Sequence, residues 1–488
     1  MTCSSWNIVF GPPGTGKTTF GMNFVEDQIK RGIDPSRIGY IAFTRRAANE
    51  ARERAQKNFN LTDDDLTFFR TIHSLCFMQL GINPSGMMQQ QHWTEIGELL
   101  GVETTGMGGM NEDAYNMSMP TGDRLFFLEN LSRITRSSLR EVYEQTVDDD
   151  IDYDQLVIAA KTLTEYKKSR KLLDFTDLLD KWLEKGHAPR LDALFVDEAQ
   201  DLSKIQWEVV HKISREVPLK YAAGDDDQAI YRWAGAAVEE FINLPGDKTV
   251  LSHSYRIPEA VHTMANSLLD NIGYRQEKEF THNGKPGYVN YHFSAEDLDL
   301  DTGDWLLLAR NGYMLREYER ICEQNGYPYE SPSRKPLKSA ALRAVKDWTQ
   351  LCKGQTLIGK QLKNVRRFHG FSFNIDDERI YAFSDLQLEN RPWFEVFKRI
   401  SPTLREYFLA AKRRGESLLK PRIKINTIHG VKGGEADHVA IMTDMAARSY
   451  RYMQMFPDDE QRVFYVAATR AKSGLNIIQP QSRLFFEI

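Results

Sequence analysis

The residues of this chain that could do chemistry begin with a glycine-rich loop. Gly11–Thr18 reads GPPGTGKT and fits the phosphate-loop pattern GxxxxGK[ST]. Glycines let backbone N–H groups crowd around phosphate oxygens, and a helix that starts at the loop adds a favourable dipole. Lys17 would reach the β and γ phosphates of a nucleotide, and Thr18 would ligate magnesium. The predicted binding set comprises Gly11, Pro12, Pro13, Gly14, Thr15, Gly16, Lys17, Thr18 and Thr19.

A phosphate loop needs a partner that holds the metal and orients water. LFVDEAQD at Leu194–Asp201 supplies one at the end of an apolar run. Asp197 would hold Mg²⁺, and Glu198 would polarise the attacking water, as phosphoryl transfer requires. Together the two segments predict a site that hydrolyses a nucleoside triphosphate with Mg²⁺.

The elements that must position these residues follow a βα pattern. Short apolar segments alternate with amphipathic helical stretches, which is typical of parallel sheets covered on both faces. The first group of expected strands is Trp6–Phe10, Ile38–Phe43, Ala193–Val196, Leu219–Ala223 and Thr249–Leu251. The second group is Gly287–Phe293, Trp305–Ala309, Ile423–Thr427, His438–Met442 and Leu475–Ile478. The pattern predicts an α/β protein with two sheets.

Two blocks interrupt this alternation. The first runs from about Cys76 to Thr164 and is expected to be mostly helical, with a flexible loop at Gly106–Gly122 and an acidic run at Asp148–Asp150. The second lies between about Ser331 and Pro421, with helices expected near Ala340–Leu351 and Pro402–Arg414. Both are interpreted as insertions into the α/β framework.

Composition limits the class of protein. A chain of 488 residues exceeds the roughly 250 to 300 at which a single core stops growing, so two or more domains are expected. Its 41% hydrophobic and 27% charged residues are those of a globular protein, and no apolar run suggests a membrane helix or a secretion signal. The net charge of −5 argues weakly against a protein that coats nucleic acid through bulk positive charge, and it is compatible with a local basic groove. Four scattered cysteines, Cys3, Cys76, Cys322 and Cys352, favour reduced structural thiols and a cytosolic compartment.

An ordered series of motifs resembles the UvrD/Rep/PcrA-like helicases of superfamily 1. The series is AFTRRAA at Ala42–Ala48, TIHS at Thr71–Ser74, LDFTDLL at Leu173–Leu179, VDEAQD at Val196–Asp201, GDDDQAIYRWAGA at Gly224–Ala236, SYR at Ser254–Arg256, TIHGVKGGEADHV at Thr427–Val439 and YVAATRAK at Tyr465–Lys472. The matches occur in the family's order and leave only the two interrupting blocks unmatched.

This resemblance implies two RecA-like P-loop motor domains, each with an inserted, mostly helical subdomain. The first RecA-like ATPase domain is expected at 1–75 and 165–253, with its insertion at 76–164. The second is expected at 254–330 and 421–488, with a reduced insertion at 331–420.

The resemblance also implies roles around ATP. Gln228 is similar to the family's γ-phosphate sensor, and Arg256 and Arg470 are similar to the arginines that contact the transferring phosphoryl group. With Lys17, Asp197 and Glu198 they make up the expected catalytic set. Tyr255 resembles the ring that stacks on adenine, and Gly433 and Glu435 lie in the motif that contacts the ribose side. The implied cofactors are ATP and Mg²⁺.

On the nucleic-acid side, a motor that grips any sequence needs base-stacking rings and phosphate contacts. Tyr231 and Trp233 resemble the family's stacking aromatics, with Phe43 as a weaker candidate. The remaining expected contacts to the strand are Thr44, Arg45, Thr71, His73, Thr427 and His429. No cluster of His, Cys and Asp with zinc spacing supports a metal role for the histidines.

Four departures limit what the resemblance carries. Ten residues precede Gly11, too few for the family's upstream glutamine motif, so adenine is expected to be read mainly by stacking and weakly discriminated. Ala234 replaces the arginine usual after the tryptophan, and Lys432–Ala436 reads KGGEA where the family has KGLEF. The second insertion is also short, so duplex contacts of that domain are not carried over.

The leading interpretation is an ATP-dependent DNA helicase that moves 3′-to-5′ on single-stranded DNA and unwinds duplex. It would act in replication, repair or recombination, on single strands and single-strand/duplex junctions, in the cytoplasm or in a host cytoplasm if phage-encoded. The alternatives are an ATP-driven translocase or protein-displacing subunit of a larger repair, recombination or defence complex, and a nucleotide-gated binding module. Intact Lys17, Glu198, Gln228, Arg256 and Arg470 argue against the binding module.

Overall fold

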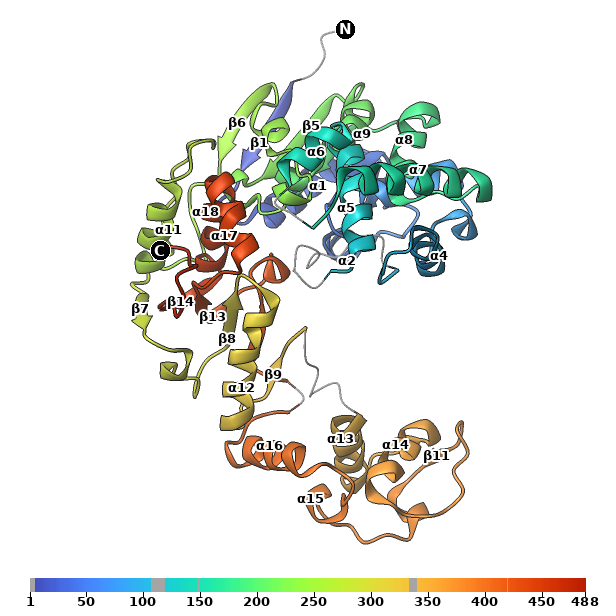
Figure 1. Ribbon diagram of the computed structural model, residues 1–488, viewed down its shortest axis with the longest axis vertical. Helices are drawn as coiled ribbons and strands as arrows, with labels where there is room; N and C mark the ends of the chain where they lie inside the picture. Colours follow the sequence, from blue (N-terminus) through green and yellow to red (C-terminus); the bar gives the residue numbers. More distant parts are fainter. Residues whose placement is uncertain (1–4, 107–118, 147–149, 333–339, 419) are drawn as a thin grey trace. The chain divides into compact units, whose positions relative to one another are not determined.

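The computed structural model describes residues 5–106, 119–146, 150–332, 340–418 and 420–488. The chain forms two compact units (Figure 1). The first comprises Met1–Val289, Met445–Gly474 and Leu484–Ile488, and the second comprises Asn290–Asp444 and Leu475–Arg483. The predicted limits of the four domains stay a prediction.

The first unit is built on a six-stranded parallel sheet with the order β3-β2-β4-β5-β1-β6. Its strands are β1 (Trp6–Phe10), β2 (Ile38–Ile41), β3 (Phe69–Arg70), β4 (Ala193–Val196), β5 (Leu219–Gly224) and β6 (Gly246–Val250). Alternate side chains of a strand face opposite sides of the sheet. Ile8 and Phe10 therefore join one core cluster, and Val9 joins another. Burial of both faces explains why β1, β2 and β4 are nearly continuous apolar runs, whereas β6 at the edge of the sheet is exposed and polar.

Helices cover both faces of this sheet. One face is packed by α1 (Lys17–Lys30) and α2 (Arg45–Phe59), and the other by α3 (Ile72–Leu80), α8 (Phe175–Lys185), α9 (Lys204–Ser214) and α10 (Val238–Ile242). Three further helices of the unit are α11 (Glu259–Leu269), α17 (Ala447–Met455) and α18 (Pro457–Ala468). This arrangement brings the carboxyl ends of β1, β4 and β5 to one edge of the sheet, where ligands of open α/β sheets bind.

The first interrupting block is helical, as predicted. It contains α4 (Gln90–Leu100), α5 (Thr121–Ile134), α6 (Leu139–Gln145) and most of α7 (Tyr153–Arg170), which share their own small apolar clusters. The expected limits at 75/76 and 164/165 fall inside α3 and α7, which continue unbroken across them. Most of the predicted Gly106–Gly122 loop and Asp148 and Asp149 of the acidic run lie outside the described residues.

A second six-stranded sheet has the order β7-β14-β13-β8-β12-β9. Its strands are β7 (Tyr288–His292), β8 (Trp305–Ala309), β9 (Tyr329–Glu330), β12 (Ile423–Thr427), β13 (Ala436–Met442) and β14 (Ala471–Ile478). The central pairs, β8 with β12 and β8 with β13, are parallel. Together with the first sheet, it confirms the predicted α/β class with two sheets.

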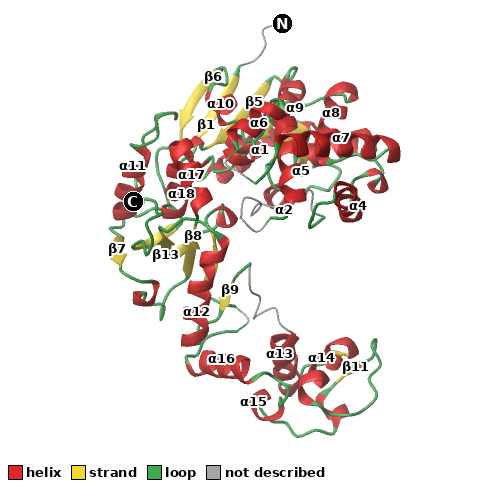
Figure 2. Ribbon diagram, in the orientation of Figure 1, coloured by secondary structure: helices red, strands yellow, loops and turns green. Residues whose placement is uncertain are grey.

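The second interrupting block carries helices and only short strands (Figure 2). Its helices are α13 (Ala340–Cys352), α14 (Gly359–His369), α15 (Trp393–Val396) and α16 (Pro402–Arg413), and its two short strands, β10 (Leu357–Ile358) and β11 (Ile380–Tyr381), pair antiparallel. One buried apolar cluster runs from these helices to α12 (Leu315–Asn325) and the second sheet. The two helices predicted in this block are confirmed.

The ten predicted strands are all present, with ends shifted by a few residues. Among the described residues, four short strands, β3, β9, β10 and β11, were not predicted, because two-residue strands are too short to show a period. Cys76 and Cys322 are buried free thiols and Cys352 is half-buried, whereas Cys3 lies outside the described residues. In the described part of the chain, every helix is too short or too polar to cross a membrane.

Candidate functional site

The phosphate loop joins β1 to α1 at the carboxyl edge of the first sheet. Gly14 and Gly16 have φ angles of 74° and 89°, a left-handed backbone that favours glycine. A Cβ at Gly11 would lie 2.1 Å from Cγ of Lys17, whose Nζ donates to the Gly11 carbonyl at 2.6 Å. The other predicted loop residues divide by exposure: Pro12, Pro13 and Thr15 are buried, and Thr18 and Thr19 are exposed in the first turn of α1. The loop therefore combines close backbone packing, an ammonium group and a helix N-terminus, which suit it to phosphate.

Asp197 and Glu198 follow β4 at the same edge. The hydroxyl of Tyr40 donates to Oδ2 of Asp197 at 2.8 Å, and the Glu198 N–H donates to Oδ1 at 2.9 Å. Burial, and then the charge of Glu198, raises the pKa of Asp197 to about 6. The carboxylates of Asp197 and Glu198 and the hydroxyl of Thr18, in the first turn of α1, offer oxygen ligands, which are the kind that Mg²⁺ prefers.

Gln200 fixes the side chain of Glu198 relative to β5. Its amide Nε2 donates to Oε2 of Glu198 at 2.6 Å, and its Oε1 accepts from the N–H of Asp225 at 3.0 Å. Glu198 itself has a φ of 51°, an unusual backbone for a residue other than glycine. The backbone and the hydrogen bond from Gln200 therefore orient this carboxylate, and Gln200 was not among the residues predicted from the sequence.

Gln228 lies between an acidic and a basic side chain. Its Nε2 donates to Oδ2 of Asp225 at 2.6 Å, and its Oε1 accepts from Nη2 of Arg470 at 2.7 Å. Burial, and then the charge of Arg256, lowers the pKa of Arg470 to about 9. The structure thus brings together three of the predicted catalytic residues, Gln228, Arg256 and Arg470.

The segment that carries Arg256 packs directly on the phosphate loop. The Ser254 hydroxyl donates to the Pro13 carbonyl at 2.8 Å, and the Tyr255 N–H donates to the Gly14 carbonyl at 2.9 Å. A Cβ at Gly14 would lie 2.4 Å from Cβ of Arg256, so glycine permits this approach. The Tyr255 side chain is 74% exposed, which leaves its ring open to a base. Ser254 was not assigned a role from the sequence.

Three consecutive aspartates, Asp225, Asp226 and Asp227, bring their carboxylates together and could suggest a metal site. However, Nζ of Lys278 lies 3.3, 2.7 and 2.6 Å from the three carboxylates in that order, and its side chain is 1% exposed. Arg275 adds two hydrogen bonds to Asp227 at 2.8 and 2.7 Å. The cluster is therefore a buried ion-pair network that supports Gln228, with an ammonium in the place a cation would take.

Aromatic residues line a cavity of about 280 Å³, here called the aromatic hollow, whose rings are Phe43, His73, Phe127, Tyr231 and Trp233. The rings of Phe43 and Tyr231 are stacked with centroids 6.0 Å apart, and those of Phe127 and Trp233 are 5.9 Å apart. Trp233 is only half-buried. The structure therefore gathers all three predicted stacking residues and adds Phe127, which the sequence did not identify.

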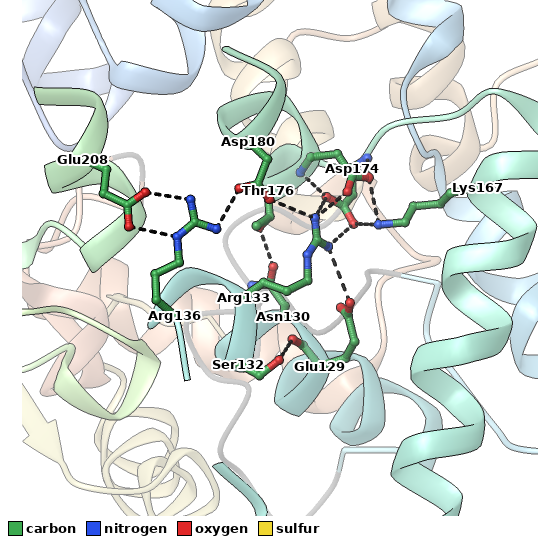
Figure 3. A network of polar contacts seen from close by, with 11 residues as sticks. Glu129, Asn130, Ser132, Arg133, Arg136, Lys167, Asp174, Thr176, Asp180 and Glu208 are labelled. Carbon is green, nitrogen blue, oxygen red and sulfur yellow. Dashed lines mark hydrogen bonds and ion pairs between the residues drawn. The ribbon is translucent and has the colours of Figure 1, made fainter. Parts of the chain in front are cut away.

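A network of charges holds α5, and with it Phe127, against α8 (Figure 3). Arg133 of α5 donates to Asp174 at 2.7 Å and to Asp177 at 2.5 Å, and Nζ of Lys167 lies 2.5 Å from Asp174. Thr176 donates to Asn130 of α5 at 2.6 Å. The polar residues of LDFTDLL thus join helices, and their role in this structure is to position the wall of the aromatic hollow.

The predicted strand contacts at the starts of α2 and α3 also have local roles. Thr44 and Thr71 are the N-caps of these helices and accept hydrogen bonds from the N–H groups of Ala47 and Ser74 at 3.2 and 3.3 Å. Burial, and then the charge of Arg45, lowers the pKa of His73 to about 4, so its imidazole is neutral at pH 7. Arg45 itself is exposed.

Four predicted site residues lie in the second unit. Thr427 is buried at the end of β12, and its hydroxyl accepts from the Gly430 N–H at 3.1 Å. His429 is buried in the turn that follows. Gly433 and Glu435 are exposed just before β13. These residues are close to one another in the chain, and their roles stay predictions.

Comparison with known proteins matches most of the chain to one family. Residues 2–249 match the model of the UvrD/REP helicase N-terminal domain, and residues 316–482 match that of the UvrD-like helicase C-terminal domain. A probable DNA helicase of Mycoplasma pneumoniae is 25% identical over 362 residues, 68% of this chain and 64% of the relative. The ATP-dependent DNA helicase Rep of Buchnera aphidicola is 23% identical over 366 residues, 66% of this chain and 52% of the relative.

A shorter match is closer in sequence. DNA helicase II of Escherichia coli is 35% identical over 143 residues, 26% of this chain and 20% of the relative. The matched part of the chain spans less than two thirds of the length of each of these relatives. The N-terminal family model alone covers half of the chain, and the phosphate loop, the strand-end carboxylates and Gln228 all lie within that match. The chain therefore belongs to the UvrD/Rep-like helicases of superfamily 1.

Proposed function

We propose that this chain is an ATP-dependent DNA helicase that moves 3′-to-5′ along single-stranded DNA and couples each hydrolysis to unwinding. The observation that carries the proposal is the course of Gly224–Ala236. Its Gln228 lies in the hydrolytic site against Arg470, and five residues later Trp233 lines the aromatic hollow. One short segment thereby touches both the nucleotide side and the nucleic-acid side.

In this proposal the chain's own residues divide the work of hydrolysis. Lys17 and the loop from Gly11 to Thr19 bind the phosphates, and Thr18 and Asp197 hold Mg²⁺, which when bound neutralises charge on the β and γ phosphates. Glu198, aimed by Gln200, orients the water and accepts its proton. Gln228, Arg256 and Arg470 stabilise the charge of the transferring group. Tyr255 stacks on adenine, and Gly433 and Glu435 contact the ribose.

On the other side, Phe43, Tyr231 and Trp233 stack on bases. The strand backbone is contacted by Thr44, Arg45, Thr71, His73, Thr427 and His429. A neutral His73 serves as a hydrogen-bond partner and not as a cation, in keeping with its lowered pKa. Stacking accepts every base, so we expect little sequence preference. The proposed substrates are single strands and single-strand/duplex junctions in the cytoplasm, and replication or repair proteins are the proposed partners.

The test measures ATP hydrolysis and strand separation together. The purified chain is mixed with ATP, Mg²⁺ and a duplex bearing a single-stranded tail, with Glu198→Gln as the matched inactive control. Strand-stimulated hydrolysis with unwinding is the expected result. Hydrolysis and movement without unwinding would instead support the translocase or protein-displacing alternative, and the absence of stimulated hydrolysis would refute both.

A further inference from the structure

A second cavity, of about 450 Å³, lies beside the aromatic hollow and is lined by arginines. We name it the arginine hollow and define it by Arg45, Asn49, Arg52, Arg70, His73 and Phe175. His73 lines both hollows, so the two are neighbours. Arg52 and Arg70 belong to none of the motifs considered so far.

Helix geometry explains how two of the three arginines come to face one cavity. Arg45, Asn49 and Arg52 are spaced four and three residues apart on α2, which puts them on one side of the helix. Ala48 lies on the same side and, being small, leaves room between the long side chains. Arg70 ends β3, and Phe69, the residue before it, also lines the cavity.

The positive charge of the arginine hollow has no acidic counterpart. None of its lining residues is Asp or Glu, and among the described residues Arg45, Arg52 and Arg70 make no ion pair. Burial, and then the charge of Arg52, lowers the pKa of Arg70. Arg54, on the same helix but facing away, is by contrast paired with Glu50 at 2.5 Å. Like charges gathered in a partly desolvated cavity are unfavourable unless an anion joins them.

Local hydrogen bonds use only part of these guanidinium groups. Nη2 of Arg52 donates to the Phe69 carbonyl at 2.9 Å, while its buried Nε has no acceptor among the described residues. Arg70 donates Nε to the Thr67 carbonyl at 2.5 Å and Nη1 to the Ser74 hydroxyl at 3.3 Å. A guanidinium carries five N–H donors, so both side chains retain donors for a ligand.

We propose that the arginine hollow binds two backbone phosphates of single-stranded DNA, one at Arg52 and one at Arg70. The strand whose bases stack in the aromatic hollow continues past His73, and Arg52 and Arg70 hold its next phosphates. The Phe175 side chain, 40% exposed and edge-on to the His73 ring at 5.8 Å, offers a face for the accompanying base. The inference rests on the proposed function and adds to it a binding site for the phosphates of the DNA strand.

Salt dependence gives a direct readout of phosphate contacts. For single strands, log K falls with log[salt] with a slope of about −0.7 for each phosphate neutralised. Arg52→Gln and Arg70→Gln should each reduce the magnitude of the slope by about 0.7, and the double variant by about 1.4. Arg54→Gln removes the same charge from α2 outside the hollow and should leave the slope unchanged. Arg70→Lys keeps the charge and should retain the slope.

A chemical substitution on the DNA then locates the contact. Neutral methylphosphonates are placed at one position at a time along a short single strand. Native protein should lose affinity at the one or two positions that reach the hollow, whereas the Arg52→Gln/Arg70→Gln variant should show no loss at those positions. If the double variant proves unfolded by its thermal melt, Arg70→Gln alone carries the same comparison.

Unchanged salt slopes in folded variants, or identical methylphosphonate profiles for native and variant protein, would overturn the proposal. The proposed helicase function is judged separately, by whether the native protein hydrolyses ATP in response to a single strand. Native stimulation together with unchanged slopes therefore rejects the arginine hollow and leaves the motor intact.

Discussion

Single residues in the proposed ATP site are held in electrostatic states that a nucleotide would relieve. Burial, and then the charge of Arg256, lowers the pKa of Arg470. Burial, and then the charge of Glu198, raises the pKa of Asp197. The protein thus keeps two cationic groups near each other and two carboxylates near each other. Such a site is complementary to a ligand that brings a polyanion and a divalent cation together, which is what Mg²⁺-ATP does.

Glu198→Gln tests the water-activating role with little structural change. The glutamine keeps an oxygen that can accept from Gln200, but it cannot take a proton from water. Strand-stimulated kcat should fall on the order of a hundredfold or more, while a fluorescent ATP analogue still binds. Lys17→Ala, in contrast, should lose binding and turnover together. Turnover of Glu198→Gln near the native rate would show that another group serves as the base.

Trp233→Ala tests base stacking, with Trp207→Ala as its matched control. Trp233 is half-buried in the aromatic hollow, whereas the side chain of Trp207, on α9, is 1% exposed and packs in the core of the first unit. Loss of one stacking contact should weaken single-strand binding by about 1 to 3 kcal/mol. Loss of the core tryptophan should cost about 3 to 5 kcal/mol of unfolding free energy. Urea unfolding and titration with a single strand, done on both variants, distinguish base stacking from core packing. A large loss of unfolding free energy in Trp233→Ala would show that Trp233 is a core residue.

At the scale of elements, the sequence predicted what is local and missed what depends on packing. The phosphate loop and the end of β4 were predictable, because apolar runs followed by glycines or carboxylates mark strand ends. Phe127 was missed because its partner in the aromatic hollow, Trp233, lies more than a hundred residues away in the chain. Lys278 was missed because a lysine looks like a surface residue unless its burial among Asp225, Asp226 and Asp227 is known.

The element contact drawn in Figure 3 also has a predicted pH dependence. Burial raises the pKa of Glu129 from 4.5 to about 7, against the opposing charges of Arg133 and Lys167. Because the folded-state pKa lies above the unfolded one, the protonated form stabilises the fold below about pH 4.5, and this contribution is lost as pH rises through 7.

Glu129→Gln should therefore remove that loss. Between pH 5 and 7, the unfolding free energy of the native protein should fall relative to that of the variant, and the two curves should run parallel above about pH 8. Denaturant unfolding at a series of pH values provides the comparison. Parallel curves throughout would mean that Arg133 keeps Glu129 ionised across the range.

At the scale of the whole molecule, each of the two sheets carries residues of the predicted site at the ends of its strands. In the first sheet, Lys17, Asp197 and Gln228 follow the carboxyl ends of β1, β4 and β5, and parallel strands bring them to one edge without any sequence proximity. In the second sheet, Thr427 ends β12, whereas Glu435 precedes the first residue of β13, at the opposite edge. The same architecture supports helicases and simple translocases, so the direction and outcome of movement must be measured on the intact chain.

Direction of movement is the prediction that belongs to this scale. AFTRRAA and GDDDQAIY resemble the 3′-to-5′ branch of the superfamily, so loading should require a 3′ single-stranded tail. Duplexes with a 3′ tail should unwind at least about tenfold faster than those with a 5′ tail, a difference of about 1.4 kcal/mol in barrier. Streptavidin displacement checks movement without unwinding, since a 3′-to-5′ motor clears a biotin at the 5′ end of a single strand and leaves one at the 3′ end. Preferential clearance of the 3′ end would reverse the assignment, because the motor would then be travelling toward that end.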